Sequence, residues 1–342
     1  MASSLSTRKI GNDSVTAIGF GAMSLSAFYG TPKPDEERLK FLDHLYASGC
    51  RNWDTANTYG DSELLIGEWF ERTGKRGDIF LATKFGIALS EETGRPVGVN
   101  GKPEYCKAEI EKSLARLGVD YVDLYYLHRP DTTVPIEKTV GAMADLVKAG
   151  KVRYLGLSEC SASTLRRAYA VHPISAIQVE YSIFTLDIEN PRIDLLRTAR
   201  ELGVSIVAYS PLGRGMLTGR IKSPDSFEPN DFRKALPRFS AENFPKVTKA
   251  VDAVAVIARK HNATPGQVAL AWLLAQGDDI IPIPGTTKVE NLDENLGAMK
   301  LKLTDDDVLA LRKLAEDIEG TLGERNVPIS VKMLFADTPP LA

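Results

Sequence analysis

The sequence is poor in cysteine, in excess basic charge and in long apolar runs. Its 342 residues include three cysteines, Cys50, Cys106 and Cys160, which lie far apart and form no CxxC motif. Neither a structural zinc site nor a disulfide framework is therefore expected. Lysine and arginine number 42 against 45 aspartate and glutamate residues, a formal net charge of −3. A nucleic-acid-binding protein would be expected to carry a basic excess, so we expect no nucleic-acid partner.

The apolar content is ordinary in amount and scattered in short stretches. The longest stretch, VALAWLLA at 268–275, is far shorter than a transmembrane helix requires. The N-terminal residues lack the apolar segment of a signal peptide, and the final TPPLA matches no lipidation or retention signal. We therefore expect a cytoplasmic protein that has no membrane partner.

Eight short apolar segments alternate with segments of helical periodicity. The apolar segments are rich in β-branched and aromatic residues, as strands buried on both faces are. They lie at 15–21, 52–56, 79–86, 122–129, 152–159, 176–182, 205–212 and 280–285. Apolar residues recur at helical spacing in several of the intervening segments, such as 107–118 and 247–258. This order is typical of parallel strands joined by helical crossovers.

Eight such units predict an α/β fold of the closed (β/α)8 type, a TIM barrel that occupies 1–342 as one domain. An open Rossmann sheet is the alternative. However, IGFGAMS at 18–24 lacks the third glycine of that fold's phosphate-binding turn, and no helix follows at once. We also expect an N-terminal β-hairpin that caps the barrel floor and a C-terminal helix at 304–319. A long loop after the seventh strand, at 213–245, contains four phenylalanines and is expected to act as a lid.

Reactive groups in β/α barrels lie at the C-terminal ends of the strands. Asp54 with nearby Tyr59, then Lys84 and His128, occupy these ends in the second, third and fourth predicted strands. A tyrosine titrates near pH 10, and we expect the Lys84 ammonium to lower that pKa while Asp54 holds the lysine. His128 can donate a hydrogen bond to a carbonyl oxygen or help to pass a proton. The four residues together suit the protonation of an oxyanion, and the carboxylates are too few for a hard-cation site, so no metal is expected.

Three segments resemble the catalytic segments of the aldo-keto reductase family: DTANTYG at 54–60, ATKFG at 82–86 and LHRPD at 127–131. Two more, at 208–219 and 281–298, resemble the cofactor segments of that family, so the resemblance covers nearly the whole chain. The segment at 156–189 is most similar to the branch that holds perakine reductase, auxin-induced-type proteins and yeast-type pyridoxal reductases. The resemblance implies hydride transfer from NADPH to an aldehyde or ketone, with Asp54, Tyr59, Lys84 and His128 as the catalytic tetrad and Tyr59 as general acid.

The resemblance also implies a set of cofactor-binding residues. Tyr209 would stack on the nicotinamide ring, and the other positions would hold the carboxamide, the pyrophosphate and the adenosine half. The carboxamide residues would be Ser158, Glu159 and Gln178. The pyrophosphate residues would be Ser210, Pro211, Leu212, Gly213 and Gly215. The residues of the adenosine half would be Gly285, Thr286, Thr287, Lys288, Asn291, Glu294 and Asn295.

Two positions depart from the common family pattern. Glu159 stands where many members have asparagine, and Asn291 where many have an arginine for the 2′-phosphate. Lys288 is then the main cation of the motif, and we expect a preference for NADPH that is less strict than usual.

Substrate recognition is the least determined part of the sequence. Phe28 and Tyr29 are expected either to wall the substrate pocket or simply to pack. Pyridoxal and aromatic or secondary-metabolite aldehydes are the candidate small-molecule carbonyl substrates, and no oligomeric state is predicted. Two other functions stay open: a regulatory binding subunit, like the potassium-channel β-subunits, and a Schiff-base aldolase that uses Lys84.

Overall fold

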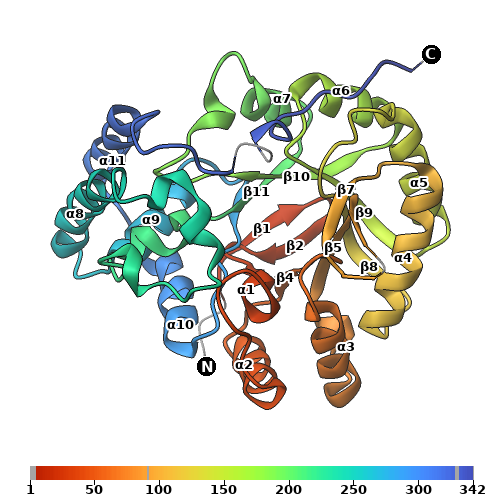
Figure 1. Ribbon diagram of the computed structural model, residues 1–342, viewed down its shortest axis with the longest axis horizontal. Coiled ribbons are helices and arrows are strands. Elements are labelled where there is room, and N and C mark those ends of the chain that lie inside the picture. The colour runs from red at the N-terminus through yellow and green to blue at the C-terminus, as the bar shows by residue number, and fades with distance from the viewer. Residues whose placement is uncertain (1–4, 91, 328–330, 342) are drawn as a thin grey trace.

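The computed structural model describes residues 5–90, 92–327 and 331–341, and its centre is a curled sheet of eight parallel strands (Figure 1). Each strand pairs with the next one along the chain. They are β3 (Phe20–Gly21), β4 (Asn52–Asp54), β5 (Phe80–Phe85), β8 (Val122–Leu127), β9 (Val152–Ser158), β10 (Ile174–Glu180), β11 (Ser205–Tyr209) and β12 (Ile280–Pro282). This arrangement confirms the predicted α/β barrel.

Hydrogen bonds between the first and last strands close the sheet. The Gly19 amide donates to Pro282 O at 2.9 Å, and the Gly21 amide donates to Pro284 O at 3.3 Å. The two edges approach closely because the residues there have no side chain. A Cβ on Gly21 would lie 2.8 Å from Ile283 O, and a Cβ on Gly285 would lie 2.8 Å from Gly21 O. Gly285, predicted to bind cofactor, therefore also takes part in barrel closure.

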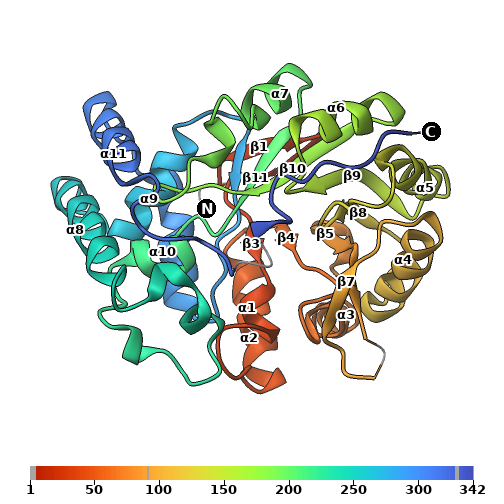
Figure 2. The same ribbon diagram turned by 45° about the horizontal axis from the view of Figure 1, so that its top comes forward.

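Helices surround the sheet in both views (Figures 1 and 2). They are α1 (Met23–Ser26), α2 (Asp35–Ala47), α3 (Ser62–Thr73), α4 (Pro103–Leu117), α5 (Ile136–Lys148), α6 (Ala162–Val171), α7 (Leu195–Glu201), α8 (Phe244–Lys260), α9 (Pro265–Leu274), α10 (Val289–Gly297) and α11 (Asp305–Ile318). The predicted helices at 107–118, 247–258 and 304–319 correspond to α4, α8 and α11. The Thr304 hydroxyl accepts from Asp307 N at the start of α11, so a side-chain cap fixes where this helix begins.

The expected N-terminal hairpin is present as β1 (Thr7–Ile10) and β2 (Asp13–Thr16), which pair antiparallel. Ile10 and Val15 belong to the apolar cluster inside the barrel, so the hairpin closes the floor. The first predicted strand, 15–21, is therefore wrong as one unit. Its first residues pair with β1, and only Phe20–Gly21 joins the barrel, because the hairpin supplies a nearer partner.

The loop at 213–245 consists largely of short 3-10 turns: η3 (Gly213–Thr218), η4 (Pro224–Ser226), η5 (Phe232–Ala235) and η6 (Pro237–Phe239). Phe227 and Phe239 are buried against each other, with ring centroids 5.6 Å apart. Much of the loop thus packs into the core, and its movement as a lid stays a prediction. A second hairpin, β6 (Ile87–Leu89) with β7 (Pro96–Val99), follows β5 and was not predicted, because its mostly exposed β7 lacks an apolar face.

Replacement of Gly21 by alanine tests the closure of the barrel. We expect Gly21→Ala to lower the free energy of unfolding by about 1–3 kcal/mol, because the new Cβ meets a carbonyl oxygen of rigid backbone. Gly141→Ala in α5 is the matched control, since a Cβ there meets nothing within 4 Å. A mid-helix alanine should stabilise the protein by about 0.5–1 kcal/mol. Equal changes in urea unfolding of the two variants would contradict this account.

Candidate active site

The ends of β4, β5 and β8 bring the predicted catalytic residues together. Asp54 is the last residue of β4, Lys84 is the fifth residue of β5, and His128 directly follows β8. Tyr59 lies in the connection between β4 and α3. Lys84 is fully buried and Asp54 is 3% exposed, so their charges meet inside the protein.

The Lys84 ammonium connects the other groups. It forms an ion pair with Asp54 Oδ1, donates to Thr55 O at 2.8 Å and lies 3.5 Å from the Tyr59 hydroxyl. Gln178 Nε2 donates to the second oxygen of Asp54 at 2.8 Å. Asp54 is itself held by Gln178, so this carboxylate fixes the position of the buried Lys84 ammonium.

Burial and charge set the protonation of this cluster. Burial opposes the charge on Lys84, but the Asp54 carboxylate and Tyr59 outweigh it and raise the lysine pKa. Burial raises the pKa of Tyr59 above its ordinary value, more than the Lys84 ammonium lowers it. Lys84 does lower the pKa of Tyr59, as expected. The predicted net decrease in that pKa is wrong, because burial of the phenol raises it by more. Burial, with Lys84 and Arg129, holds the pKa of His128 well below its usual range. Tyr59 is thus a protonated phenol and His128 a neutral imidazole at neutral pH.

Aromatic rings line the space beside Tyr59. The rings of Tyr59 and His128 are 5.9 Å apart at 82°, and Phe28 meets Tyr59 edge-to-face at 6.4 Å. Phe28 is 39% exposed and has a left-handed backbone, with φ of 72°. Phe232 from η5 lies against Phe28 at 6.1 Å. Tyr29 instead contacts the Arg233 guanidinium at 4.8 Å, so it packs against the 213–245 loop.

The predicted nicotinamide residues lie at the ends of the next strands. Ser158 ends β9 and is buried, and Glu159 follows it in a left-handed conformation. The Tyr209 hydroxyl, at the end of β11, donates to Glu159 Oε1 at 2.7 Å. Arg325 reaches the same carboxylate at 3.4 Å. Sequence reasoning missed Arg325 because it lies after α11, outside every strand-end motif.

Arg129 directly follows His128 and is not among the site residues that the sequence predicts. The structure brings it close to Glu159 and Tyr209, since β8 ends at Leu127 and the chain turns there. Burial opposes ionisation of Glu159, but Arg325 and Arg129 outweigh it and hold its pKa below the ordinary value. The sequence around Glu159 did not predict that this carboxylate interacts with Arg325 and Arg129.

The predicted pyrophosphate segment has unusual backbone. Ser210, Gly213, Arg214 and Gly215 have φ of 50°, 55°, 56° and 96°, while Pro211 and Leu212 are buried between them. Left-handed backbone at non-glycine residues costs about 1–3 kcal/mol each and is concentrated at functional sites. Consecutive residues of this kind turn backbone amides towards one side, as anion-binding loops do.

The predicted adenosine residues lie after β12 and on α10. The hydroxyl of buried Thr286 accepts from Lys288 N at 3.1 Å, while the Lys288 side chain is exposed. Thr287 is half-buried between them, and Asn295 is buried on α10. Arg220, which follows η3, donates to the Asn291 and Glu294 side chains. Arg220 therefore brings a cation to the region where Asn291 stands in place of the arginine expected from the family pattern. The sequence did not predict Arg220 for this region because it lies far from α10 along the chain.

Several buried polar atoms at this end of the barrel fit a bound cofactor or substrate. His128 Nδ1, Arg129 Nη1 and Asn326 Nδ2 have no hydrogen-bond partner among the described residues. Buried polar atoms without partners are rare in proteins, so each of these atoms is suited to a ligand. The Asn326 side chain lies against Arg214, whose Nη2 donates to Asn326 Oδ1 at 2.9 Å.

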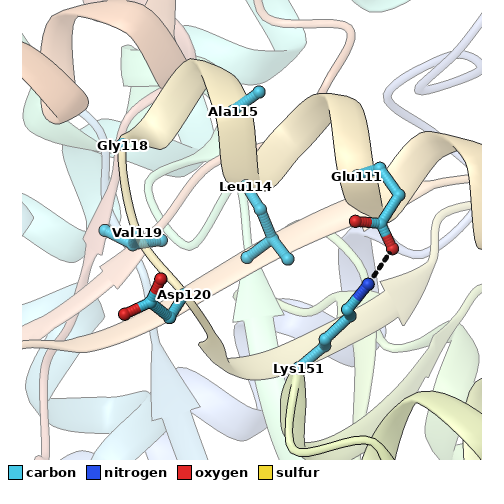
Figure 3. A pocket seen from close by; sticks show the side chains of 7 residues that line it. All are labelled: Glu111, Leu114, Ala115, Gly118, Val119, Asp120 and Lys151. Carbon is cyan, nitrogen blue, oxygen red and sulfur yellow. Dashed lines mark hydrogen bonds and ion pairs between the residues drawn. The ribbon is translucent and has the colours of Figure 1, made fainter.

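A hollow also occurs at the opposite end of the barrel, by the amino ends of β8 and β9 (Figure 3). It is lined by Glu111, Leu114, Ala115, Gly118, Val119, Asp120 and Lys151, of which Lys151 and Glu111 form an ion pair. None of the predicted site residues lies in it.

Across the described ranges, no cluster of three or more His, Cys, Asp or Glu residues is arranged to hold a metal ion. The helices of the same ranges include none with the length and apolar character to cross a membrane.

Comparison with known proteins identifies the family. The sequence profile of the Aldo/keto reductase family matches residues 17–316. The chain belongs to the aldo/keto reductase family. It is 59% identical to aldo-keto reductase str7 of Strobilurus tenacellus, over 98% of this chain and 99% of that protein. It is 51% identical to aldo-keto reductase yakc [NADP(+)] of Schizosaccharomyces pombe, over 99% of both.

The solved structures agree with this assignment. The glycerol dehydrogenase AKR11B4 from Gluconobacter oxydans superposes with a TM-score of 0.81 at 27% identity, over 93% of this chain and 96% of that one. As an aldo/keto reductase, the chain is an oxidoreductase of a family that generally reduces carbonyl compounds and uses a nicotinamide cofactor.

Removal of the Asp54 charge tests the buried ion pair. We expect Asp54→Asn to lower the free energy of unfolding by about 3 kcal/mol, because Lys84 is then buried without a counter-ion. Asp293→Asn removes a half-exposed carboxylate that contacts His44, and it should cost less than about 0.5 kcal/mol. Urea unfolding at pH 7 measures both, and a similar small loss in the two variants would contradict the ion-pair account.

Proposed function

We propose that the chain reduces an aldehyde or ketone to an alcohol with NADPH, and that Tyr59 supplies the proton. The observation that carries this proposal is the contact of a buried, charged Lys84 with both Asp54 and the Tyr59 hydroxyl. Family membership supports the reaction class, and the arrangement of these three side chains supports the assignment of their roles.

The side chains carry out the proton half of the reaction. Tyr59 holds its proton because burial raises the phenol pKa, and it donates that proton to the carbonyl oxygen as negative charge develops there. Lys84 lies 3.5 Å from the same hydroxyl and stabilises the phenolate as it forms. Neutral His128, whose ring lies 5.9 Å from that of Tyr59, would orient the carbonyl oxygen by a hydrogen bond. NADPH, when bound, supplies the hydride that goes to the carbonyl carbon.

Residues at the ends of β9 to β12 would hold the cofactor. Ser158, Glu159 and Gln178 would contact the carboxamide and Tyr209 the ring face, while Ser210, Pro211, Leu212, Gly213 and Gly215 would surround the pyrophosphate. Gly285, Thr286, Thr287, Lys288, Asn291, Glu294 and Asn295 would face the adenosine half. Arg220 adds a second cation at the Asn291 and Glu294 side of this region, which supports a preference for the 2′-phosphate of NADPH.

For the substrate we propose an aromatic aldehyde, with pyridoxal as one candidate and a secondary-metabolite aldehyde as another. Phe28 supports this choice because it is exposed, conformationally strained and edge-to-face with Tyr59. An aromatic ring placed there gains contact with Phe28 and Phe232.

The aldolase alternative fits the site less well. A Schiff-base lysine is normally activated by a lowered pKa, whereas Asp54 and Tyr59 raise the pKa of Lys84 above its ordinary value despite burial. A regulatory binding subunit would share this geometry, and the turnover rate separates it from an enzyme.

Replacement of Tyr59 by phenylalanine tests the proposed acid. We expect NADPH oxidation with 4-nitrobenzaldehyde or pyridoxal to fall about 10²–10⁴-fold, because the proton donor is lost while the pocket shape remains. NADPH binding, followed by fluorescence, should persist. Tyr154→Phe is the matched control, since Tyr154 contacts Gly11 of the floor hairpin. Equal activity in wild type and Tyr59→Phe would contradict the assignment, and a wild type that binds no NADPH would refute the proposed function.

Replacement of Arg220 tests the second cation. We expect Arg220→Met to weaken the use of NADPH by about tenfold, because a charge-assisted contact to the 2′-phosphate is lost. Use of NADH should change little, since NADH lacks that phosphate. The exposed Arg192, in the loop before α7, provides the control variant Arg192→Met. Equal effects of Arg220→Met on kcat/KM for the two cofactors would show that Arg220 does not read the phosphate.

A further inference from the structure

The chain beyond α11 returns to the site and attaches to Glu159. In Figure 2 this dark blue segment runs from α11 towards the ends of β9 and β10. Ala336 N donates to Glu159 O at 3.2 Å, and Ser161 N donates to Ala336 O at 3.1 Å. The main chain of Glu159 is therefore held on one side by the C-terminal segment, and on the other its amide donates to Gln178 O at 3.1 Å.

Arg325, from the same C-terminal segment, holds the Glu159 side chain. Its Nη1 and Nη2 donate to the two carboxylate oxygens of Glu159, each at 3.4 Å. Nη1 also donates to the Tyr209 hydroxyl at 3.2 Å and to Glu180 Oε2 at 3.2 Å. The Nε atom donates to Asp187 at 3.0 Å. One guanidinium thus joins the ends of β9, β10 and β11.

A carboxylate at position 159 requires such a partner. Glu159 is fully buried, and a buried charge is tolerated only when it is paired and hydrogen-bonded. The charged and titratable groups that face it are Arg325, Arg129, Tyr209, Glu180 and Asp187. Two of these are carboxylates. Glu180 also lies 3.7 Å from Arg214 and 3.8 Å from Arg238, so Arg325 and Arg129 are the arginines that offset the charge of Glu159. Arg325 contacts Glu159, Glu180 and Asp187, and of the two arginines it lowers the pKa of Glu159 more.

We propose that Arg325 is a positioning residue of the cofactor site. Its guanidinium neutralises Glu159 and fixes the Tyr209 hydroxyl, so that the carboxylate and the tyrosine ring are preformed for the nicotinamide. Glu159 and Arg325 then act as a unit: a glutamate at this position depends on the arginine, and a neutral amide there does not. This inference rests on the proposed function only in taking the nicotinamide as the ligand.

The test measures NADPH affinity by fluorescence in a double-mutant cycle. We expect Arg325→Met to weaken NADPH binding by about tenfold or more at pH 8, because Glu159 is left charged and under-compensated. Glu159→Gln/Arg325→Met should recover most of that loss, since the carboxylate at position 159 is then gone, Glu180 keeps Arg214 and Arg238, and Asp187 is partly exposed to solvent. Arg325→Lys, which keeps the charge without the two-pronged contact, should lie between Arg325→Met and wild type.

The pH dependence provides a readout that loss of structure alone would not give. Without Arg325, the pKa of Glu159 rises, so the carboxyl is neutral below that pKa and charged above it. NADPH affinity of Arg325→Met should therefore recover as the pH falls from 8 towards 5.5, relative to wild type at each pH.

Arg167→Met is the matched control for attachment of the C-terminal segment. Arg167 donates to Thr338 O at 2.8 Å and to Pro339 O at 2.6 Å, and it does not touch Glu159. It should leave NADPH affinity unchanged. The proposal is overturned if Arg325→Met binds NADPH as tightly as wild type, if the double variant binds no better than Arg325→Met, or if Arg167→Met weakens binding equally. Binding is measured without turnover, so an inactive wild type that binds NADPH would refute the proposed reaction and leave this test intact.

Discussion

Lys84 carries a positive charge inside a barrel whose interior is otherwise lined mainly by apolar and aromatic side chains. Asp54 makes that charge possible, because the paired carboxylate offsets the cost of burial. The position of the ammonium then determines what its neighbours can do. It lies beside the Tyr59 hydroxyl, disfavours protonation of His128, and leaves the second oxygen of Asp54 to accept from Gln178. The proposed proton donor, the neutral imidazole and one proposed carboxamide residue thus all depend on one buried ion pair.

A second buried charge cluster lies beside the first and is built differently. Glu159, Glu180 and Asp187 come from the β9 to β11 side of the barrel, whereas the guanidinium that joins them comes from the C-terminal segment. The tetrad is therefore complete within the barrel strands and their loops, but the proposed nicotinamide side needs the C-terminal segment as well. The 213–245 loop adds Phe232, which contacts Phe28 on the proposed substrate side, and is followed by α8. The C-terminal segment and the 213–245 loop thus both contribute residues to the carboxyl ends of the barrel strands, where the candidate site lies.

The sequence predicts the barrel and the meeting of Asp54, Tyr59, Lys84 and His128 at one end of it, because both follow local rules. Apolar runs mark the strands, and the polar residues that end them meet at one end of a parallel barrel. Arg325 and Arg220 could not be found in this way, since each is brought to the site by a segment distant from the groups it contacts. Arg129 was not predicted because, on a continuous strand, the residue after His128 would point the opposite way, whereas β8 ends at Leu127. The net pKa shift of Tyr59 was misjudged because a single neighbouring charge is visible in the sequence, whereas the degree of burial is not.

The account rests most directly on the protonation of Tyr59. Its phenolate can be followed in the free protein by the ultraviolet absorbance difference between wild type and Tyr59→Phe as the pH is raised. Because burial raises the pKa of Tyr59, the phenol is the stable form below that pKa and is lost only as the pH passes above it. We predict no phenolate difference signal through the neutral range, and its appearance only above about pH 10, where ordinary tyrosines titrate. A difference signal already at neutral pH would show that Lys84 outweighs burial, and would contradict the proposed state of the acid.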